Sequence, residues 1–252
     1  MGARRKDPLP DLNLGEGGKG VIAQPKSKET PQRSPAPWQW RIGERSLIIS
    51  LGEIHQMLSW APLNGGARRA SAILNHQIAP GDSRASERPR PYLQALVRRL
   101  GLRPQAAVAM MTGADVYKAG YATACRGDLA VGAWCTAGCS NALRIGDPAM
   151  ATKRGPGTIN IAMVVSQPLS RCAMAEALAM VTEARVAAVH DAGISSARTR
   201  RPATGTGTDC IVVAAPIRGP AHAYCGKHTV LGELIGKAAM RSCAIALRRC
   251  CS

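Results

Sequence analysis

A chain of 252 residues, 46% of them apolar, is long enough and apolar enough to fold as one or two domains rather than remain disordered. No run of about 18 apolar residues occurs, and no apolar segment follows the charged N-terminus, so neither a membrane-spanning helix nor a secretory signal is predicted. The net charge of +17 suggests nucleic-acid binding, but the basic residues are spread along the chain with few aromatic residues among them. We therefore expect a cytoplasmic protein, with neither a membrane nor a nucleic acid as its partner.

Residues 1–46 are predicted to form a flexible, basic tail, because they are rich in Pro and Gly and lack a periodic apolar pattern. From Leu47 onward, short apolar runs alternate with turn residues, so residues 47–252 are expected to form one catalytic domain. The nine cysteines are odd in number and include no Cys-x-x-Cys pair. Neither a disulfide framework nor a zinc ribbon is therefore expected.

Short apolar runs in this domain predict about nine strands, of which two flank Arg126-Gly127-Asp128 as a hairpin. The expected strands are 47–51, 54–60, 70–78, 106–111, 119–125, 129–136, 158–166, 211–215 and 222–225. Helices are expected at 92–100, 171–192 and 230–249, and residues 80–90 are expected to be a polar loop. The fold class is therefore α+β, a mixed α/β sandwich in which a mixed, largely antiparallel sheet is covered by the two long helices.

Glycine, asparagine and threonine concentrate in four segments of the domain. The segments are 61–66, 136–147, 157–160 and 203–209. At strand ends such segments expose backbone N–H groups and short polar side chains, which bind amides, oxyanions or phosphates. Ordinary turns use the same residues, so one such segment alone is weak evidence, whereas four in one domain favour a site.

Three titratable residues are candidates for catalysis: Asp209, Glu183 and His228. Asp209 closes the 203–209 segment, where a carboxylate serves as a general base, a substrate anchor or a turn cap. Glu183 lies in an otherwise apolar helical stretch and is expected to point inward, although its stripe would also suit a solvated face. His228 directly precedes the last helix, where it would be neutral and able to accept a proton, or would cap that helix.

Several familiar motifs are almost but not fully present. Gly226-Lys227 lacks the residues of a phosphate-binding loop, and no dinucleotide fingerprint occurs. Gly138-Cys139-Ser140-Asn141-Ala142 departs from a nucleophile elbow at Ala142. No metal-ligand spacing is present, so no metal site is predicted, although a metal held by distant residues (His76, Asp209, His228) stays open. The sequence leaves the cofactor requirement and the oligomeric state unknown.

Taken in order, the segments resemble the adenosylcobinamide amidohydrolase family of corrinoid salvage. The resemblance rests on 61–66, 136–142 with Gly146-Asp147, 157–160, 182–184, 203–209, 226–228 and 231–236. It covers about residues 47–247 and excludes the tail. It implies hydrolysis of the amide that joins the corrin propionyl side chain to aminopropanol, which yields adenosylcobyric acid and 1-aminopropan-2-ol. The implied partner is therefore the corrinoid adenosylcobinamide.

Hydrolysis of an unactivated amide needs an attacking oxygen, a stabilised oxyanion and a proton for the leaving amine. We expect Asp209 or Glu183 to activate water or a hydroxyl, and His228 to protonate the amine. Direct attack by water and a covalent acyl-enzyme remain open. The candidate substrate-binding residues are Asn64, Gly65, Ser140, Asn141, Thr158, Asn160, Thr206 and Thr208. The alternatives are a corrinoid-binding protein without catalysis and a basic nucleic-acid-binding protein.

Overall fold

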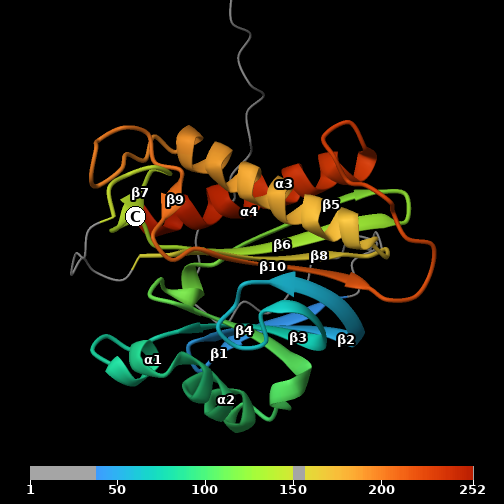
Figure 1. The fold of residues 1–252 in the computed structure, drawn as a ribbon, viewed down its shortest axis with the longest axis horizontal. Coiled ribbons are helices and arrows are strands. Elements are labelled where there is room, and N and C mark those ends of the chain that lie inside the picture. Colours follow the sequence, from blue (N-terminus) through green and yellow to red (C-terminus); the bar gives the residue numbers. More distant parts are fainter. Residues whose placement is uncertain (1–37, 150–156, 252) are drawn as a thin grey trace, which may run out of the picture. The chain divides into compact units, whose positions relative to one another are not determined.

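The computed structural model describes residues 38–149 and 157–251. In chain order the elements are β1 (Gln39–Gly43), β2 (Ser46–Ser59), β3 (Gly66–Gln77), α1 (Ser83–Glu87), α2 (Pro89–Arg99), β4 (Ala107–Thr112), β5 (Gly120–Arg126), β6 (Leu129–Ala137), β7 (Ala142–Leu143), β8 (Ile159–Val165), α3 (Arg171–Asp191), β9 (Gly205–Thr206), β10 (Cys210–Pro216) and α4 (Val230–Cys251), with short 3-10 turns at Pro104–Ala106 and Val116–Lys118. The strands form a mixed, largely antiparallel sheet, and α3 and α4 cover one of its faces (Figure 1). The predicted α+β class is confirmed.

One eight-stranded sheet contains most of the strands, in the order β4-β3-β2-β10-β8-β6-β5, with β1 also paired to β2. Among the strand pairs of the described ranges, only β3–β4 and β8–β10 are parallel. The register between β2 and β3 shifts between Ser50 and His55, and Gly52 has a φ of 74°. Because a glycine adopts this φ without a Cβ clash, β2 can bend there. Its first half pairs with β1 and its second half with β10.

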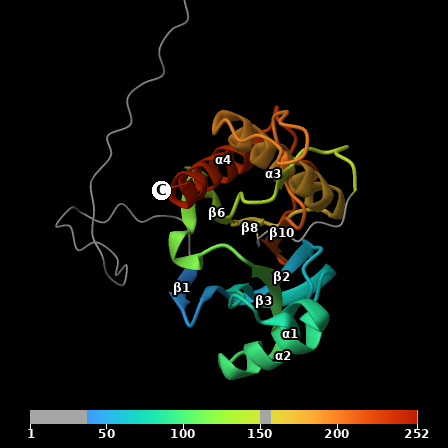
Figure 2. The same ribbon diagram turned by 90° about the vertical axis from the view of Figure 1, so that its left-hand side faces the viewer.

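The bend turns the sheet into two layers, so the core is divided into three parts. The first lies between α3, α4 and strands β5, β6, β8 and β10. The second lies between the two sheet layers and includes Trp38 and Trp134, whose rings meet edge to face. The third packs α2 against β2, β3 and β4. Figures 1 and 2 show the resulting order of helices, sheet, sheet and helices.

Alternation along the strands explains how each layer serves two cores. In β10, Ile211 and Val213 face the helices, whereas Val212 and Ala214 face the central core. Strand side chains alternate between the two faces, so a strand covered on both sides is apolar throughout. This accounts for the continuous apolar runs 161–165 in β8 and 211–215 in β10.

Helix α3 begins and ends within one residue of its predicted bounds, and α4 begins at the predicted Val230 but runs two residues past its predicted end, to Cys251. The Ser170 hydroxyl accepts a hydrogen bond from Ala173 N at 3.0 Å and so caps α3, while Gly193 follows the helix with a φ of 66°. Helix α4 and β5 approach each other closely at Gly120, where the absence of a side chain permits the contact. A Cβ at this position would lie 2.1 Å from the Ser242 carbonyl oxygen. None of the helices in the described ranges combines the length and the apolar character needed to cross a bilayer.

Four local predictions differ from the structure. Strand β1 lies inside the range 1–46 that was expected to be a tail, so the fold begins before Leu47; residues 1–37 lie outside the described ranges. The runs 47–51 and 54–60 are one bent strand rather than two. The expected loop 80–90 contains α1 and the first two residues of α2. Residues 222–225 form no strand, and only His222 makes a single bridge, to Leu169.

Candidate active site

Two of the four polar segments line one cavity of about 590 Å³. Segments 136–147 and 203–209 pair there as β7 and β9, with Ala142 opposite Thr206. The Thr204 hydroxyl accepts a hydrogen bond from Ile145 N at 2.9 Å, which holds the two segments together at the mouth. The lining residues are 143–149, Thr182, Arg185, Val186, Arg198, 204–206 and Asp209. The pairing of two distant segments thus builds a cavity beside α3.

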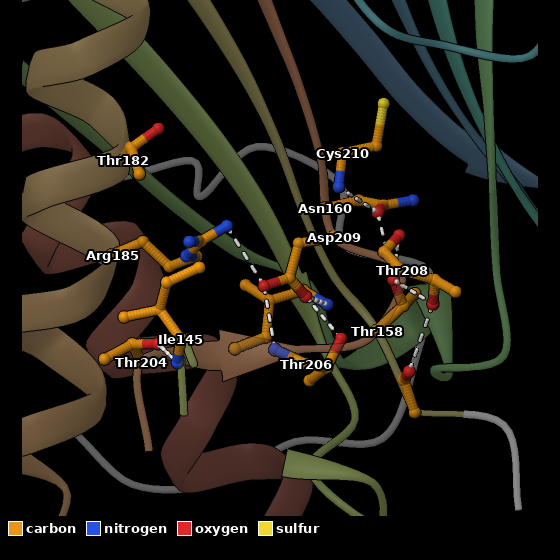
Figure 3. Close-up of polar contacts among 12 residues, drawn as sticks. Ile145, Thr158, Asn160, Thr182, Arg185, Thr204, Thr206, Thr208, Asp209 and Cys210 are labelled. Atoms are coloured by element: carbon orange, nitrogen blue, oxygen red, sulfur yellow. Dashed lines mark hydrogen bonds and ion pairs between the residues drawn. The ribbon is translucent and has the colours of Figure 1, made fainter. Parts of the chain in front are cut away.

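Asp209 lies at the wall of this cavity, and its carboxylate is held on both oxygens (Figure 3). Oδ1 accepts hydrogen bonds from Ile159 N at 2.9 Å and from the Thr206 hydroxyl. Oδ2 accepts one from Thr206 N at 2.8 Å and lies 3.0 Å from Arg185 Nη1. The side chains of Arg185 and Asp209 are only 12% and 7% exposed. The ion pair is therefore largely shielded from solvent, where its charges interact more strongly than at the surface.

Neighbouring residues fix the position of this carboxylate further. A Cβ on Gly205 would lie 2.2 Å from Asp209 Oδ2, so only glycine fits there. The Trp60 indole N–H donates to the Asp209 carbonyl oxygen at 2.7 Å, which brings segment 61–66 beside the site. Trp60 itself lines a second, smaller cavity of about 300 Å³ together with Asn64 and Gly65. Asp209 therefore lines one cavity and is hydrogen-bonded to a residue that lines a second.

Chemically, the cavity presents a carboxylate that already accepts a hydrogen bond from a hydroxyl. Because Thr206 donates to Asp209 Oδ1, the Thr206 hydroxyl is oriented with its proton toward a base. Both oxygens of this carboxylate already have partners among the described residues. The carboxylate is therefore better placed to accept the proton of the Thr206 hydroxyl than that of a water molecule. The arrangement suits a hydroxyl that gives up its proton to a carboxylate.

Two predicted substrate-binding residues, Thr158 and Asn160, are buried instead. Asn160 is 1% exposed, and its amide accepts from Cys210 N at 3.1 Å while donating to Asn75 Oδ1 at 2.9 Å and to Met111 O at 2.7 Å. Thr158 is 4% exposed and donates to Thr208 O at 2.9 Å. These groups bond to the protein, so their geometry gives them a structural role, and the prediction that they contact substrate is not supported.

Asn64 is also engaged in structure. Its φ is 58°, and its Nδ2 donates to the carbonyl oxygens of Pro104 at 2.6 Å and Ala107 at 2.7 Å. A Cβ on Gly65 would lie 2.5 Å from the Ala61 carbonyl oxygen. The two residues thus close a tight turn that ties the end of β2 to β4. Trp60, which lines the same 300 Å³ cavity, connects this turn to Asp209.

Ser140 and Asn141 meet segment 157–160 at Gly157. A Cβ on Gly157 would lie 2.3 Å from Asn141 Oδ1 and 2.9 Å from Ser140 Oγ, so the backbone approaches both side chains closely. Among the described residues that line the 590 Å³ cavity, neither Ser140 nor Asn141 occurs. Thr208 likewise turns toward Thr158, at 3.3 Å between the hydroxyl oxygens. Of the predicted substrate-binding residues, Thr206 alone is among the described residues that line the cavity.

Glu183 and His228 lie apart from Asp209, contrary to the prediction of one shared site. Glu183 points outward, since its side chain is 56% exposed and pairs with Lys227. His228 is exposed and follows the loop after β10, a strand of 7 residues and thus about 20 Å long that begins beside Asp209. Gly226, which lies close to His228 in the chain, is beside Glu176, since a Cβ on Gly226 would lie 2.8 Å from Glu176 Oε1. Glu176 precedes Arg185 by more than two helical turns, so the segment of His228 packs on a part of α3 away from Arg185.

The comparisons with known proteins agree with the motif pattern. The family model for CbiZ, adenosylcobinamide amidohydrolase, matches residues 36–252. The chain belongs to the adenosylcobinamide amidohydrolase family. The match begins before β1, which agrees with the position of that strand in the fold. As a member of the adenosylcobinamide amidohydrolase family, the chain is a hydrolase of the amidase type.

Individual relatives are more distant. An uncharacterized protein of Methanocaldococcus jannaschii is 30% identical over 224 residues, which cover 81% of this chain and 86% of that protein. The PH0078 protein of Pyrococcus horikoshii matches in structure with a TM-score of 0.42 and 11% identity, over 91% of this chain and 82% of that one. An L-aminopeptidase D-Ala-esterase/amidase of Ochrobactrum anthropi gives 0.38 and 10%, over 84% and 83%. Because both TM-scores are below 0.5, membership of the amidohydrolase family rests on the sequence matches.

Sequence reasoning missed Arg185 and Trp60, which both bond to Asp209. Arg185 follows Val181 by four residues and precedes Ala188 by three, and both of these are buried. Residues at these spacings share a helix face, so Arg185 lies on the buried face of α3. In the described ranges of this amidohydrolase, no group of three His, Cys, Asp or Glu side chains is arranged to hold a metal ion.

Proposed function

We propose that this protein hydrolyses the amide that joins the corrin propionyl side chain of adenosylcobinamide to aminopropanol. The products are adenosylcobyric acid and 1-aminopropan-2-ol, and the acid re-enters cobalamin synthesis as the salvage product. The family match over residues 36–252 supports the substrate class. The observation that carries the proposal is the shielded Asp209–Arg185 pair, which lines a 590 Å³ cavity and holds the hydroxyl of Thr206.

The cavity suits one arm of a corrinoid rather than the whole ring. Its volume lies within the range of about 300–1,000 Å³ that is typical of small-molecule sites. Leu143, Ile145 and Val186 supply apolar surface, while Thr182 and Thr204 supply hydroxyls for the amides at the ring edge. Ile145 is 86% exposed at the mouth, where an apolar face of the ring would cover it. We therefore place the aminopropanol arm inside the cavity and the ring outside.

In the proposed reaction, Thr206 Oγ attacks the amide carbonyl carbon while Asp209 takes the hydroxyl proton. The tetrahedral intermediate then expels aminopropanol, and the proton passes from Asp209 to the leaving nitrogen. Water hydrolyses the resulting ester on Thr206 by the reverse sequence of proton transfers. Thr206 N already donates to Asp209, so the N–H groups of Gly207 and Thr208 remain for the oxyanion. Arg185 positions the carboxylate against Thr206 through its ion pair.

The first test is to incubate the purified full chain with adenosylcobinamide and to detect both products by mass spectrometry. The Asp209→Asn variant should lower kcat by a factor of about 10²–10⁴, the usual effect of losing a general base. The Asp191→Asn variant is the matched control, because Asp191 is exposed at the end of α3. Circular dichroism and thermal unfolding would show that each variant is folded. Binding of the corrinoid without any turnover would contradict the proposal and indicate a binding protein.

A second set of variants separates the two modes of attack. If Thr206 is the nucleophile, Thr206→Val should abolish turnover and Thr206→Ser should retain a measurable part of it. A protein mass increased by one adenosylcobyryl group, found after rapid acid quenching, would identify the ester intermediate. Substantial turnover by Thr206→Val would show that the Thr206 hydroxyl is not the nucleophile and that water attacks directly.

A further inference from the structure

A third cavity, of about 650 Å³, lies on the other side of the two sheet layers from the Asp209 cavity. It is bounded by the β1–β2 turn, the end of β3 and the helices α1 and α2, whereas the Asp209 cavity is bounded by α3, β7 and β9 (Figures 1 and 2). The two cavities share no lining residue among those described. Whatever binds in the third cavity therefore does so apart from the proposed amide hydrolysis.

The β1–β2 turn at its edge has a backbone conformation that its residues disfavour. Glu44 and Arg45 connect Gly43 to Ser46, with φ values of 48° and 57°. Two-residue turns of this kind normally use Asn and Gly, because other side chains clash at positive φ. The Arg45 backbone is nevertheless held there, since its carbonyl oxygen accepts from Gln77 N at 2.8 Å. Such strain at a cavity edge is a known marker of a functional position.

Inside the cavity, a chain of hydrogen bonds fixes the direction of one hydroxyl. The Ser46 hydroxyl donates to Glu44 O at 3.2 Å, so it must accept from His76 Nδ1, which lies 2.9 Å away. The imidazole then carries its proton on Nδ1, and Nε2 accepts from the Tyr92 hydroxyl at 3.2 Å. Burial, reinforced by the charge of Arg99, lowers the pKa of His76 to about 4, which keeps this ring neutral at pH 7. The Tyr92 oxygen thus offers its lone pairs as an acceptor.

The charges of the cavity are unbalanced. Four arginines and two carboxylates line it, an excess of two positive charges. Each carboxylate already has a partner, because Asp82 pairs with Arg84 at 3.0 Å and Glu44 with Arg99 at 3.7 Å. The two remaining arginines have no carboxylate partner within the described ranges. They are Arg45, which donates to Ile78 O at 2.9 Å, and Arg88, whose side chain makes no hydrogen bond there.

We propose that this cavity binds a small organic phosphate monoester. Its phosphate group would lie against the guanidinium groups of Arg45 and Arg88. Their two positive charges balance the phosphate charge of nearly −2, and each guanidinium can donate two parallel hydrogen bonds to the phosphate oxygens. A hydroxyl on the organic part would donate to the oxygen of Tyr92. Pro91 and Leu96 supply an apolar wall for the carbon chain.

Isothermal titration of the full chain with glycerol 3-phosphate at low salt tests this proposal, and it needs no corrinoid. The wild-type protein should bind one equivalent saturably. Arg88→Gln should weaken binding about tenfold or more, since a hydrogen bond to a charged group contributes about 1.5–3 kcal/mol. The matched control is Arg98→Gln, a change of the same charge on an exposed residue of α2 outside the cavity lining. It should change the dissociation constant less than about twofold, which is under 0.5 kcal/mol.

Two further comparisons test the ligand chemistry. Tyr92→Phe should weaken glycerol 3-phosphate about threefold or more but leave inorganic phosphate nearly unchanged, because one neutral hydrogen bond is worth about 1 kcal/mol. Three results would overturn the proposal. The first is an absence of saturable binding up to about 10 mM, a concentration at which even a weak site fills. The second is an equal loss of affinity in Arg88→Gln and Arg98→Gln. The third is that succinate binds as tightly as the phosphate ester.

Discussion

Replacing Arg185 by Met would remove the positive charge that faces Asp209 and leave most of the side-chain volume. Arg185 Nη1 lies 3.0 Å from Asp209 Oδ2, and the two side chains are 12% and 7% exposed. Breaking a buried ion pair typically costs about 3–5 kcal/mol, because the remaining charge is left without its partner. Asp209 retains hydrogen bonds from Ile159 N, Thr206 N and the Thr206 hydroxyl, which place the expected cost near the lower limit, about 3 kcal/mol.

For a folded unit of this size, 1 kcal/mol corresponds to a change in Tm of about 2–4 °C, so Arg185→Met should lower Tm by roughly 6–12 °C. Urea unfolding followed by circular dichroism at pH 7 would give the free energy directly. The double variant Arg185→Met/Asp209→Asn should be less destabilised than the sum of the two single variants, because the second change removes the unpaired charge.

An exposed ion pair provides the control for this experiment. Arg126 Nη2 lies 2.9 Å from Glu233 Oε2, but the two side chains are 56% and 34% exposed, so solvent screens the pair. Arg126→Met should therefore lower Tm far less than Arg185→Met. Equal effects of the two changes, or strict additivity in the double variant, would refute the view that the Asp209 carboxylate depends on its buried partner.

Three other predictions concern single side chains. Burial, and then the charge of Arg99, lower the pKa of His76 to about 4, compared with 6.5 in the unfolded chain. Below pH 6.5 the unfolded state therefore binds more protons than the folded state. The free energy of unfolding should accordingly fall as the pH is lowered from 6.5 to 4. The loss amounts to about 3 kcal/mol, and His76→Gln should flatten that part of the curve of unfolding free energy against pH, whereas an unchanged slope would argue against a neutral buried ring. Asn160→Leu should cost about 3 kcal/mol in urea unfolding, because three buried polar groups lose their partners; a cost below about 1 kcal/mol would mean that these bonds contribute little. Glu183→Gln and His228→Gln should each retain product formation within about twofold (under 0.5 kcal/mol), and a tenfold loss in either would show that the residue acts in the reaction.

Apolar patterning predicts the elements of this fold better than their connections. The apolar runs 161–165 in β8 and 211–215 in β10 indicate strands covered on both faces, and the structure buries them between the helices and the central core. The bend at Gly52 carries no comparable signal, because a glycine between two apolar runs also suits a break between strands. The sequence therefore predicts two strands where one bent strand joins the layers.

The candidate site could be predicted as a set of segments but not residue by residue. Asp209 closes a polar segment at a strand end, and the structure places it on the cavity wall. Glu183 and Arg185 are two residues apart on an Ala-rich helix with small side chains on every side, so the polarity pattern does not show which one turns inward. Asn160 lies within the apolar strand β8, but only the sandwich geometry shows that its amide is enclosed.

Strand β2 has a consequence for how the domain unfolds. Its first half contributes Leu47 and Ile49 to the central core, and its second half contributes Leu58 to the core beneath the helices. Neither sheet layer can open without disrupting hydrogen bonds that the other layer shares through this one strand. Amide hydrogens on both halves of β2 should therefore exchange with solvent water at a common, slow rate set by global unfolding, and the domain should lose its structure in a single cooperative transition.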